Sequence, residues 1–260
     1  MQTSRILDKI GRGEVVLVAN PSFTYSWRLT EMMGLLGIDG AWIDMEHRDF
    51  GYQEAAVMIL AARATGMDTV VRIRKDSYAD YFRPLEDGAT GVMVPHIKTR
   101  AEAEFAAYNT KFAPVGRRGM DGVGADVGYG LDGSTLADVN RETFCMIQLE
   151  DYEGIENIAA IISVDGISGV LVGPADLSQS YGKAGEFDCP EVRDAMLAVA
   201  DACREHGKWW GAPGINPAYT RWLIEHGAQF IALGSDYHCL LNGFRQVRED
   251  FDALLREMGR

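Results

Sequence analysis

A unit of glycine followed by an unbroken apolar run recurs along the chain and constrains the fold more than any other feature. It appears as GMDTVVRIR, GATGVMVPH, GISGVLVGP and GAQFIALGS, in each case after a stretch with the spacing of an amphipathic helix. Glycine just beyond a helix supplies the left-handed residue that closes its last turn. An unbroken run rich in Val and Ile is typical of a parallel strand that is covered on both faces. The unit therefore predicts helices that alternate with parallel strands.

About eight such strands are expected, which predicts a closed (β/α)8 barrel of the α/β class, the TIM barrel. The predicted strands span residues 15–20, 41–46, 69–74, 91–95, 145–149, 168–173, 208–213 and 230–234. The 260 residues match the length of one such barrel, so we expect a single domain over residues 1–260. An open, doubly wound sheet is the alternative, because it also alternates strands and helices. Eight units in this length favour closure.

Composition and charge exclude several classes of partner. The formal net charge of −13 argues against nucleic acid and against anionic membrane surfaces, because both require a basic patch. The first twenty residues lack the apolar core of a signal peptide, and no later run approaches the length of a membrane span. The four cysteines show no Cys-x-x-Cys spacing. We expect a cytoplasmic protein with reduced thiols that acts on a small molecule.

The longest irregular segment covers residues 113–134 and is dense in glycine. It contains GVGADVG, which superficially matches a phosphate-binding loop. The segment neither follows a strand directly nor opens an obvious helix, so a nucleotide site is not favoured there. We expect a mobile loop over the active site instead.

Polar side chains gather at the carboxyl ends of the predicted strands, where barrel enzymes carry their active sites. They are Asn20, Asp44, Glu46, His47, Arg72, Arg74, His96, Gln148, Glu150, Asp176, Ser235 and Asp236. Some of these residues have simple structural interpretations. Asp236 is suited to capping the last helix, Arg74 to facing solvent, and Glu46 to supporting a catalytic neighbour. His96 is expected either to contact substrate or to pack under the site, and the first is favoured.

Two of these acids, Glu150 and Asp176, follow neighbouring strands and should converge in the mouth of the barrel. Their mutual repulsion is best relieved by a shared cation. Two carboxylates without a His or Cys cluster suit a hard ion such as Mg²⁺ or Mn²⁺, with Co²⁺ also possible. A zinc site is not favoured, because the five histidines are spread along the chain.

Six segments resemble the signature segments of the HpcH/HpaI aldolase family, the metal-dependent class II pyruvate aldolases. They are WIDMEH, VVRIR, GATGVMVPHIKT, GRRG, MIQLED and GVLVGPADLSQSYG, and the similarity runs from about residue 15 to about residue 240. The resemblance implies a carbon–carbon lyase (EC 4.1.2.-) that reversibly cleaves a 4-hydroxy-2-oxo acid to pyruvate and an aldehyde. It implies that Glu150 and Asp176 hold the divalent ion, which pyruvate chelates.

The resemblance also assigns the catalytic residues. It matches Arg72 to the family arginine, and His47 with Asp44 to the catalytic histidine and its aspartate. Aldol cleavage leaves a pyruvate enolate, whose negative charge a preorganised cation stabilises. A histidine near neutral pH can remove the proton of the 4-hydroxyl group, and we expect Asp44 to fix the tautomer of His47.

The remaining implied contacts concern substrate and assembly. The predicted substrate-binding residues are Arg72, Gln148, Gly173, Pro174, Ala175 and Arg118. The family forms hexamers, built as trimers of dimers that exchange their last helix. The tail NGFRQVREDFDALLREM has the apolar stripe that such an exchange needs, formed by Phe244, Val247, Phe251, Leu254 and Met258. Glu86 departs from the aspartate that relatives often carry.

Three alternatives to this interpretation stay open. A lyase for acyl-CoA thioesters, similar to citramalyl-CoA or malyl-CoA lyases, shares the barrel but should show a Lys/Arg cluster for the nucleotide. A Schiff-base aldolase requires a lysine inside the mouth, where Lys75 and Lys98 are the only plausible positions and both are expected to face solvent. A metal-stabilised binding barrel without turnover would not require the combination of His47, Asp44 and Arg72.

Overall fold

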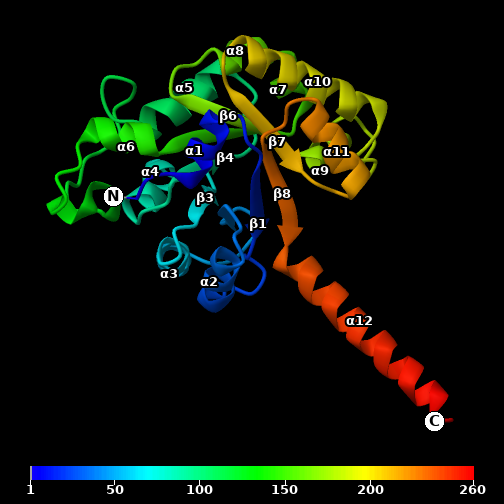
Figure 1. Cartoon of the computed structure of the whole chain (residues 1–260). Helices are drawn as coiled ribbons and strands as arrows, with labels where there is room; N and C mark the ends of the chain where they lie inside the picture. Colours follow the sequence, from blue (N-terminus) through cyan, green and yellow to red (C-terminus); the bar gives the residue numbers. More distant parts are fainter. Residues whose placement is uncertain (1) are drawn as a thin grey trace.

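The computed structural model describes residues 2–260 and shows eight parallel strands closed into a barrel (Figure 1). The strands are β1 Val16–Asn20, β2 Gly40–Asp44, β3 Asp68–Arg72, β4 Gly91–Val94, β5 Phe144–Leu149, β6 Ile167–Val172, β7 Trp209–Pro213 and β8 Phe230–Ser235. Each strand pairs with its neighbour in sequence, and β8 closes the ring by pairing with β1, with Phe230 opposite Val16. The predicted barrel is confirmed, and the open sheet is excluded by this closure.

Helices alternate with the strands and surround the barrel. They are α1 Arg5–Gly11, α2 Trp27–Leu35, α3 Tyr52–Arg63, α4 Tyr78–Glu86, α5 Arg100–Thr110, the 3-10 helix η1 Ala125–Gly130, α6 Leu136–Glu142, α7 Tyr152–Glu156, α8 Ile158–Ile162, α9 Pro174–Ser180, α10 Pro190–Glu205, α11 Pro217–Glu225 and α12 Asp236–Glu257. Local sequence explains where many of them begin. The hydroxyl of Thr99, for example, caps α5 while Glu102 bonds back to its N–H, a capping box. Proline in the first turn opens α9, α10 and α11.

Two strands end two residues earlier than the sequence predicts, and β4 and β6 end one residue earlier. The predictions for β2 and β3 run to residues 46 and 74, whereas the strands end at Asp44 and Arg72. The reason is that Met45 and Ile73 are also buried, and each still donates a backbone hydrogen bond to the next strand. The apolar pattern therefore continues for one residue past the regular pairing.

The interior of the barrel is filled by aromatic side chains. Trp209 stacks on Phe230 with ring centroids 5.7 Å apart and meets Phe144 edge-on at 5.6 Å. Glycine on the adjacent strand makes room for each bulky ring, since a Cβ on Gly169 would lie 2.3 Å from the indole of Trp209. A barrel of eight strands is therefore a packed core rather than a pore.

Helix α1 closes the amino-terminal end of the barrel. Ile6 belongs to the interior apolar cluster, and the first carboxylate of β3, Asp68, accepts hydrogen bonds from the Ser4 hydroxyl (2.7 Å) and the Ile6 N–H (2.8 Å). With this end plugged, the carboxyl ends of the strands form the open face.

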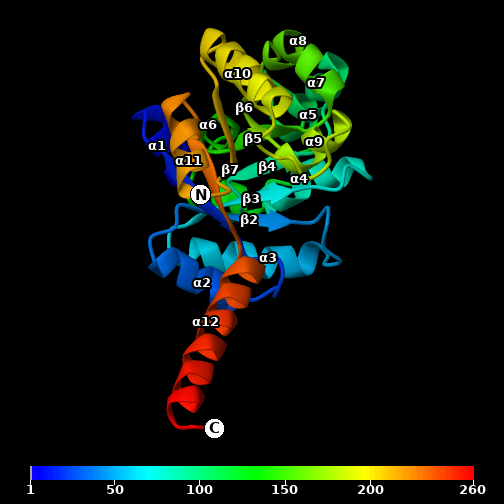
Figure 2. The same cartoon turned by 90° about the vertical axis from the view of Figure 1, so that its right-hand side faces the viewer.

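The last helix leaves the body of the molecule. Helix α12 projects from the end of β8 as a long arm in both views (Figures 1 and 2). Its large apolar side chains are exposed: Leu240, Phe244, Val247, Phe251, Leu254, Leu255 and Met258. The predicted apolar stripe is thus present, and within residues 2–260 no other part of the chain buries it. Among residues 2–260, no helix has the length and apolar character to cross a membrane.

Candidate functional site

A cavity of about 310 Å³ opens at the carboxyl ends of the strands. Its lining consists of Trp42, His47, Arg72, Gln148, Glu150, Leu171, Gly173, Pro174, Ala175, Asp176, Phe187, Pro213 and Ile215. The cavity thus collects every predicted catalytic, metal-binding and substrate-binding residue that the family resemblance assigns except Asp44 and Arg118. The other polar residues predicted at the strand ends do not line it: Asn20, Glu46, Arg74, His96, Ser235 and Asp236. A larger hollow of about 480 Å³ lies between α10 and α11, but it contains none of these residues.

An ion pair between Asp44 and Arg72 forms the floor of the site. The two residues end adjacent strands and lie opposite each other in the sheet. The guanidinium donates from Nε to Oδ1 at 2.9 Å and from Nη2 to Oδ2 at 2.6 Å, a bidentate geometry. Burial by itself raises the pKa of Asp44, but the hydrogen bonds and charge of Arg72 outweigh it and hold that pKa below its usual value. The Arg72 guanidinium also lies 5.0 Å from the centre of the Trp42 ring.

Asp44 contacts His47 differently from the sequence prediction. Its carboxylate accepts hydrogen bonds from the backbone N–H groups of Glu46 (3.1 Å) and His47 (3.3 Å). Within residues 2–260 the carboxylate of Asp44 makes no hydrogen bond to the imidazole of His47, and its side-chain partner is Arg72 instead. The expected contact that fixes the tautomer is therefore corrected. Asp44 orients the main chain that carries His47, and the imidazole itself is exposed at the rim of the cavity.

Glu150 is the most deeply buried acid of the cavity. Its side chain is 1% exposed, and burial raises its pKa to about 7. One oxygen accepts the amide of Gln148 and the other accepts the backbone N–H of His96 at 3.0 Å. Asp176 reaches the same cavity from the first turn of α9, which begins directly after β6. The sequence prediction that these two acids share one mouth agrees with this arrangement.

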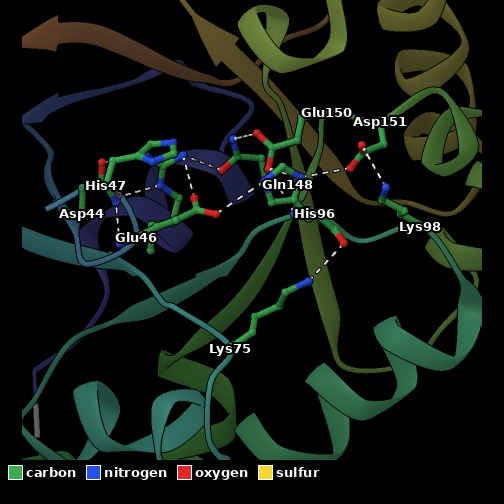
Figure 3. Close-up of polar contacts among 10 residues, drawn as sticks. Asp44, Glu46, His47, Lys75, His96, Lys98, Gln148, Glu150 and Asp151 are labelled. Atoms are coloured by element: carbon green, nitrogen blue, oxygen red, sulfur yellow. Dashed lines mark hydrogen bonds and ion pairs between the residues drawn. The ribbon is translucent and has the colours of Figure 1, made fainter. Parts of the chain in front are cut away.

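His96 lies beside the cavity rather than in its lining (Figure 3). Its Nδ1 is 3.0 Å from Asp151 Oδ2, and its Nε2 is 3.5 Å from Glu46 Oε1. Burial opposes protonation of His96, but the hydrogen bond to Asp151 and the charges of Glu150 and Glu46 raise its pKa. The His96 side chain is 40% exposed, so it neither lines the cavity nor is buried beneath it.

Both lysines considered for Schiff-base chemistry have other partners. Lys75 Nζ donates to the carbonyl oxygen of His96 at 3.1 Å, and Lys98 Nζ is 3.0 Å from Asp151 Oδ1 (Figure 3). Neither residue lines the cavity, and within the described part of the chain no other lysine does. The geometry offers no amine to form an imine with a bound keto acid.

Arg118 and the glycine-rich segment lie outside the cavity. Arg118 is buried, 2.5 Å from Asp126 Oδ2, and its guanidinium lies 4.6 Å from the centre of the Phe112 ring. The η1 helix in this segment packs Val127 against Phe112 and Val139 on the outside of the barrel. Among residues 2–260, neither Arg118 nor the glycine-rich segment that was expected to cover the site lines the cavity, and Arg118 forms an ion pair with Asp126 instead.

Sequence reasoning missed the side chains that form the outer wall of the cavity. Phe187 comes from the loop between α9 and α10, while Pro213 and Ile215 come from the end of β7 and the following loop. These residues carry no polar signal, so only their position in space identifies them. Asp151 was also missed, although it directly follows Glu150 in the sequence.

Comparison with known proteins identifies the family. The model of the HpcH/HpaI aldolase/citrate lyase family matches residues 25–243. The chain belongs to this family. The predicted resemblance is confirmed, and it covers every residue that lines the cavity.

Relatives in the HpcH/HpaI family cover nearly the whole chain. The 5-keto-4-deoxy-D-glucarate aldolase of Escherichia coli (strain K12) is 28% identical over 222 residues, which are 85% of this chain and 87% of that protein. A solved HpcH/HpaI aldolase/citrate lyase family protein from Burkholderia cenocepacia J2315 superimposes with a TM-score of 0.89 and 27% identity, covering 96% of this chain and 100% of the other. The HpcH/HpaI aldolase from Desulfitobacterium hafniense DCB-2 gives a TM-score of 0.86 and 25% identity, with 94% and 95% covered.

The residues of this chain fit the divalent cation that the HpcH/HpaI family implies. Glu150 is a buried carboxylate with a raised pKa, and a buried carboxylate is strongly stabilised by a cation. Asp176 provides a second carboxylate on the same cavity, and oxygen ligands suit a hard ion. Within residues 2–260 no group of three or more His, Cys, Asp or Glu residues is placed to hold a metal. Two protein ligands leave positions open for water and substrate, as a catalytic site requires.

Proposed function

We propose that the protein is a metal-dependent class II pyruvate aldolase that reversibly cleaves a 4-hydroxy-2-oxo acid to pyruvate and an aldehyde. The observation that carries this proposal is a single cavity lined by a guanidinium, two carboxylates and an exposed imidazole, from Arg72, Glu150, Asp176 and His47. The E. coli relative, named as an aldolase, supports the same reaction type. A Mg²⁺ or Mn²⁺ ion, or Co²⁺ in their place, held by Glu150 and Asp176 would act as a Lewis acid.

Arg72 binds the keto-acid end of the substrate. Its Nη1 lies 3.1 Å from Glu46 Oε2 and 3.5 Å from Gln148 Oε1, so this donor group faces the cavity beside Glu150. Asp44 fixes the guanidinium from the opposite side and keeps it in place before the substrate arrives. Such a preorganised positive charge stabilises the enolate oxygen that forms when the carbon–carbon bond breaks.

His47 acts as the general base. In the cleavage direction it removes the proton of the 4-hydroxyl group, directly or through one water. The C3–C4 bond then breaks, the 4-carbon becomes the carbonyl of the aldehyde, and the electron pair remains on the enolate. The enolate takes up one proton at C3 to give pyruvate, which replaces the proton that His47 removed. The imidazole stands at the cavity rim, where it can exchange its proton with solvent after each turnover.

The outer wall of the cavity favours an uncharged aldehyde with apolar carbon surface. Phe187 is 39% exposed and Ile215 is 45% exposed, and both line the cavity together with Pro213. Arg72 is the one Lys or Arg in the described lining, and it already forms ion pairs with Asp44 and Glu46 besides binding the keto-acid end. A carboxylate on the aldehyde would therefore find no further Lys or Arg side chain to bind in this lining.

An aldehyde panel tests this proposal. Pyruvate and Mg²⁺ or Mn²⁺ are supplied with pairs of similar size, such as butanal with succinic semialdehyde, and aldol formation is measured. Metal-dependent turnover with a preference for the uncharged partner is expected. His47→Ala is expected to lower cleavage by roughly 10²–10⁴-fold, the scale of a general base, whereas His206→Ala on the exposed end of α10 should not. Near-normal cleavage by H47A would remove the base assignment.

The family description also names citrate lyase, which keeps an acyl-CoA lyase as a second candidate. In that case CoA thioesters of 3-hydroxy acids would be cleaved and 4-hydroxy-2-oxo acids would not. Equal inactivity with both substrate classes, in protein shown to be folded, would instead favour a barrel that binds metal without turnover.

The exposed arm of α12 supports assembly into a homo-oligomer. A groove beside α11, lined by Ile215, Ile224 and Leu233 among others, is left open where the last helix of a barrel usually packs. A second copy that places its α12 there would cover both apolar surfaces, and a hexamer built from three such dimers is the assembly we propose. Light scattering tests it: the wild type should be a hexamer, and Phe251→Asp should shift the mass toward smaller species.

A further inference from the structure

We propose that Arg74 is a positioning residue that holds His47 at the rim of the cavity. This inference rests on the proposed function, because it takes His47 as the base. The sequence interpretation treats Arg74 as a solvated side chain, and the residue is exposed. Its guanidinium nevertheless makes two hydrogen bonds to the main chain on either side of His47.

The contacts of Arg74 bracket the segment that carries His47. Arg74 stands two residues beyond the end of β3, and its side chain reaches the loop between β2 and α3. Its Nε donates to the carbonyl oxygen of Met45 at 3.0 Å, and its Nη2 donates to the carbonyl oxygen of Phe50. The two acceptors lie two residues before and three residues after His47.

The bracketed segment has little structure of its own. Residues 46–49 form neither helix nor strand, and no backbone–backbone hydrogen bond involves them within the described chain. The carboxylate of Asp44 accepts hydrogen bonds from the backbone N–H groups of Glu46 and His47. Arg74 donates hydrogen bonds to the carbonyl groups that flank the segment. Two charged side chains, Asp44 and Arg74, therefore together restrain the path of this loop.

A guanidinium is suited to this task in a way that other side chains are not. Its donors are held in one plane, so two hydrogen bonds set the separation and direction of both carbonyl groups. Lysine carries a single ammonium group on a flexible stem and cannot impose the same geometry. Within residues 2–260 no carboxylate lies within 4.0 Å of the Arg74 guanidinium, so both contacts recorded for it are to the main chain.

Tyr25 also restrains the segment that carries His47, through contacts with Asp49 and Phe50. Its ring meets Phe50 edge-on at 4.7 Å, and its hydroxyl bonds the carboxylate of Asp49. The carbonyl of Phe50 is thus presented to Arg74 from a residue that is itself buried and packed. The segment around His47 is thus connected to the end of β3 through Arg74, and to the loop after β1 through Tyr25.

Loss of this bracket should affect proton transfer and spare substrate binding. A general base must come within about 2.6–3.2 Å of the proton donor or reach it through one water. A displacement of about 1 Å can reduce a rate by roughly 100-fold. Arg74→Met is therefore expected to lower kcat by about 10- to 100-fold, with KM for the 2-oxo acid within about twofold, because Arg72 is untouched.

A double-mutant cycle separates positioning from general stability. R74M, H47A and the double variant are compared for kcat, with Arg5→Met as the control. Arg5 also donates to a backbone carbonyl, that of Gly37 at 3.3 Å, and pairs with Asp39, but it does so at the opposite end of β2. R5M should therefore keep the wild-type kcat. If Arg74 acts through His47, R74M lowers kcat in the wild type and causes almost no further loss in H47A.

Rescue experiments keep the inference falsifiable if R74M folds poorly. In Arg74→Ala, guanidinium ion at millimolar concentrations should restore part of kcat, whereas ammonium ion should not, and Arg74→Lys should remain impaired. Equal losses from R74M in both backgrounds, or full activity of R74K, would overturn the inference. Full activity of H47A would refute the assignment of His47 as the base, and with it the proposed function of His47. An impaired H47A together with a fully active R74M would refute only the positioning role of Arg74.

Discussion

Replacement of Asp44 by Asn tests how much the floor of the site depends on one charge. Asparagine preserves the volume of the side chain, but one oxygen becomes an NH₂ group that faces a donor of Arg72. In the wild type, both oxygens accept from that guanidinium at 2.9 and 2.6 Å, and the Asp44 side chain is 3% exposed. The variant therefore leaves a buried guanidinium without its principal partner.

The size of the loss follows from this burial. Removal of one partner from a buried ion pair costs about 3–5 kcal/mol. Glu46 lies 3.1 Å from the same guanidinium and remains, which places the expected loss at the lower end, about 3 kcal/mol. For a chain of this length each kcal/mol lowers Tm by about 2–4 °C, so D44N should melt roughly 6–12 °C below the wild type.

Urea denaturation and thermal melting of both proteins measure this loss, and its pH dependence checks the cause. The pKa of Asp44 is held below its usual 3.8, so the contribution of the pair is present above that pH and is lost as the pH falls through the folded-state pKa. The difference between wild type and D44N should therefore narrow in acid. Asp194→Asn, at an exposed position of α10, is the control and should leave Tm nearly unchanged. A loss below about 1 kcal/mol at neutral pH, the value of an exposed pair, would refute the reasoning.

Three further predictions concern other parts of the barrel. Burial raises the pKa of Asp68 to about 6, so the stability it contributes is complete below pH 3.8 and is lost as the pH rises through 6. Urea titrations should show the free energy of unfolding of the wild type falling by about 3 kcal/mol relative to that of Asp68→Asn between pH 3.8 and 6. The same pH dependence of this free energy in both proteins would contradict the prediction. Gly169→Ala places a Cβ 2.3 Å from the Trp209 ring and should cost about 1–3 kcal/mol by overpacking, which melting curves would show. Glu150→Gln should weaken Mn²⁺ binding, measured by calorimetry, by at least roughly 10–100-fold, because loss of a residue that only supports a metal ligand already costs that much. Unchanged Mn²⁺ affinity would exclude Glu150 as a ligand.

Much of the site was predictable because a closed parallel barrel leaves little choice. Apolar runs such as those before Glu150 and Asp176 require cover on both faces, and eight of them in one chain close on themselves. Once the strands are parallel and the barrel is closed, the carboxyl ends of all strands surround the same opening. Periodicity alone therefore placed Arg72, Glu150 and Asp176 in one cavity, although they lie far apart in the sequence.

The tertiary structure decided which groups bind each other. Asp44 pairs with Arg72 because the register of β2 and β3 sets them opposite. The imidazole of His47 therefore lacks the Asp44 contact that was expected to fix its tautomer. Arg118 turns to Asp126 in its own loop, and Phe187 enters the wall from a loop without any polar signal. Hydrogen bonds and ion pairs act over about 3 Å. Distances of that size depend on strand register and loop path, which arise only when the whole chain has packed.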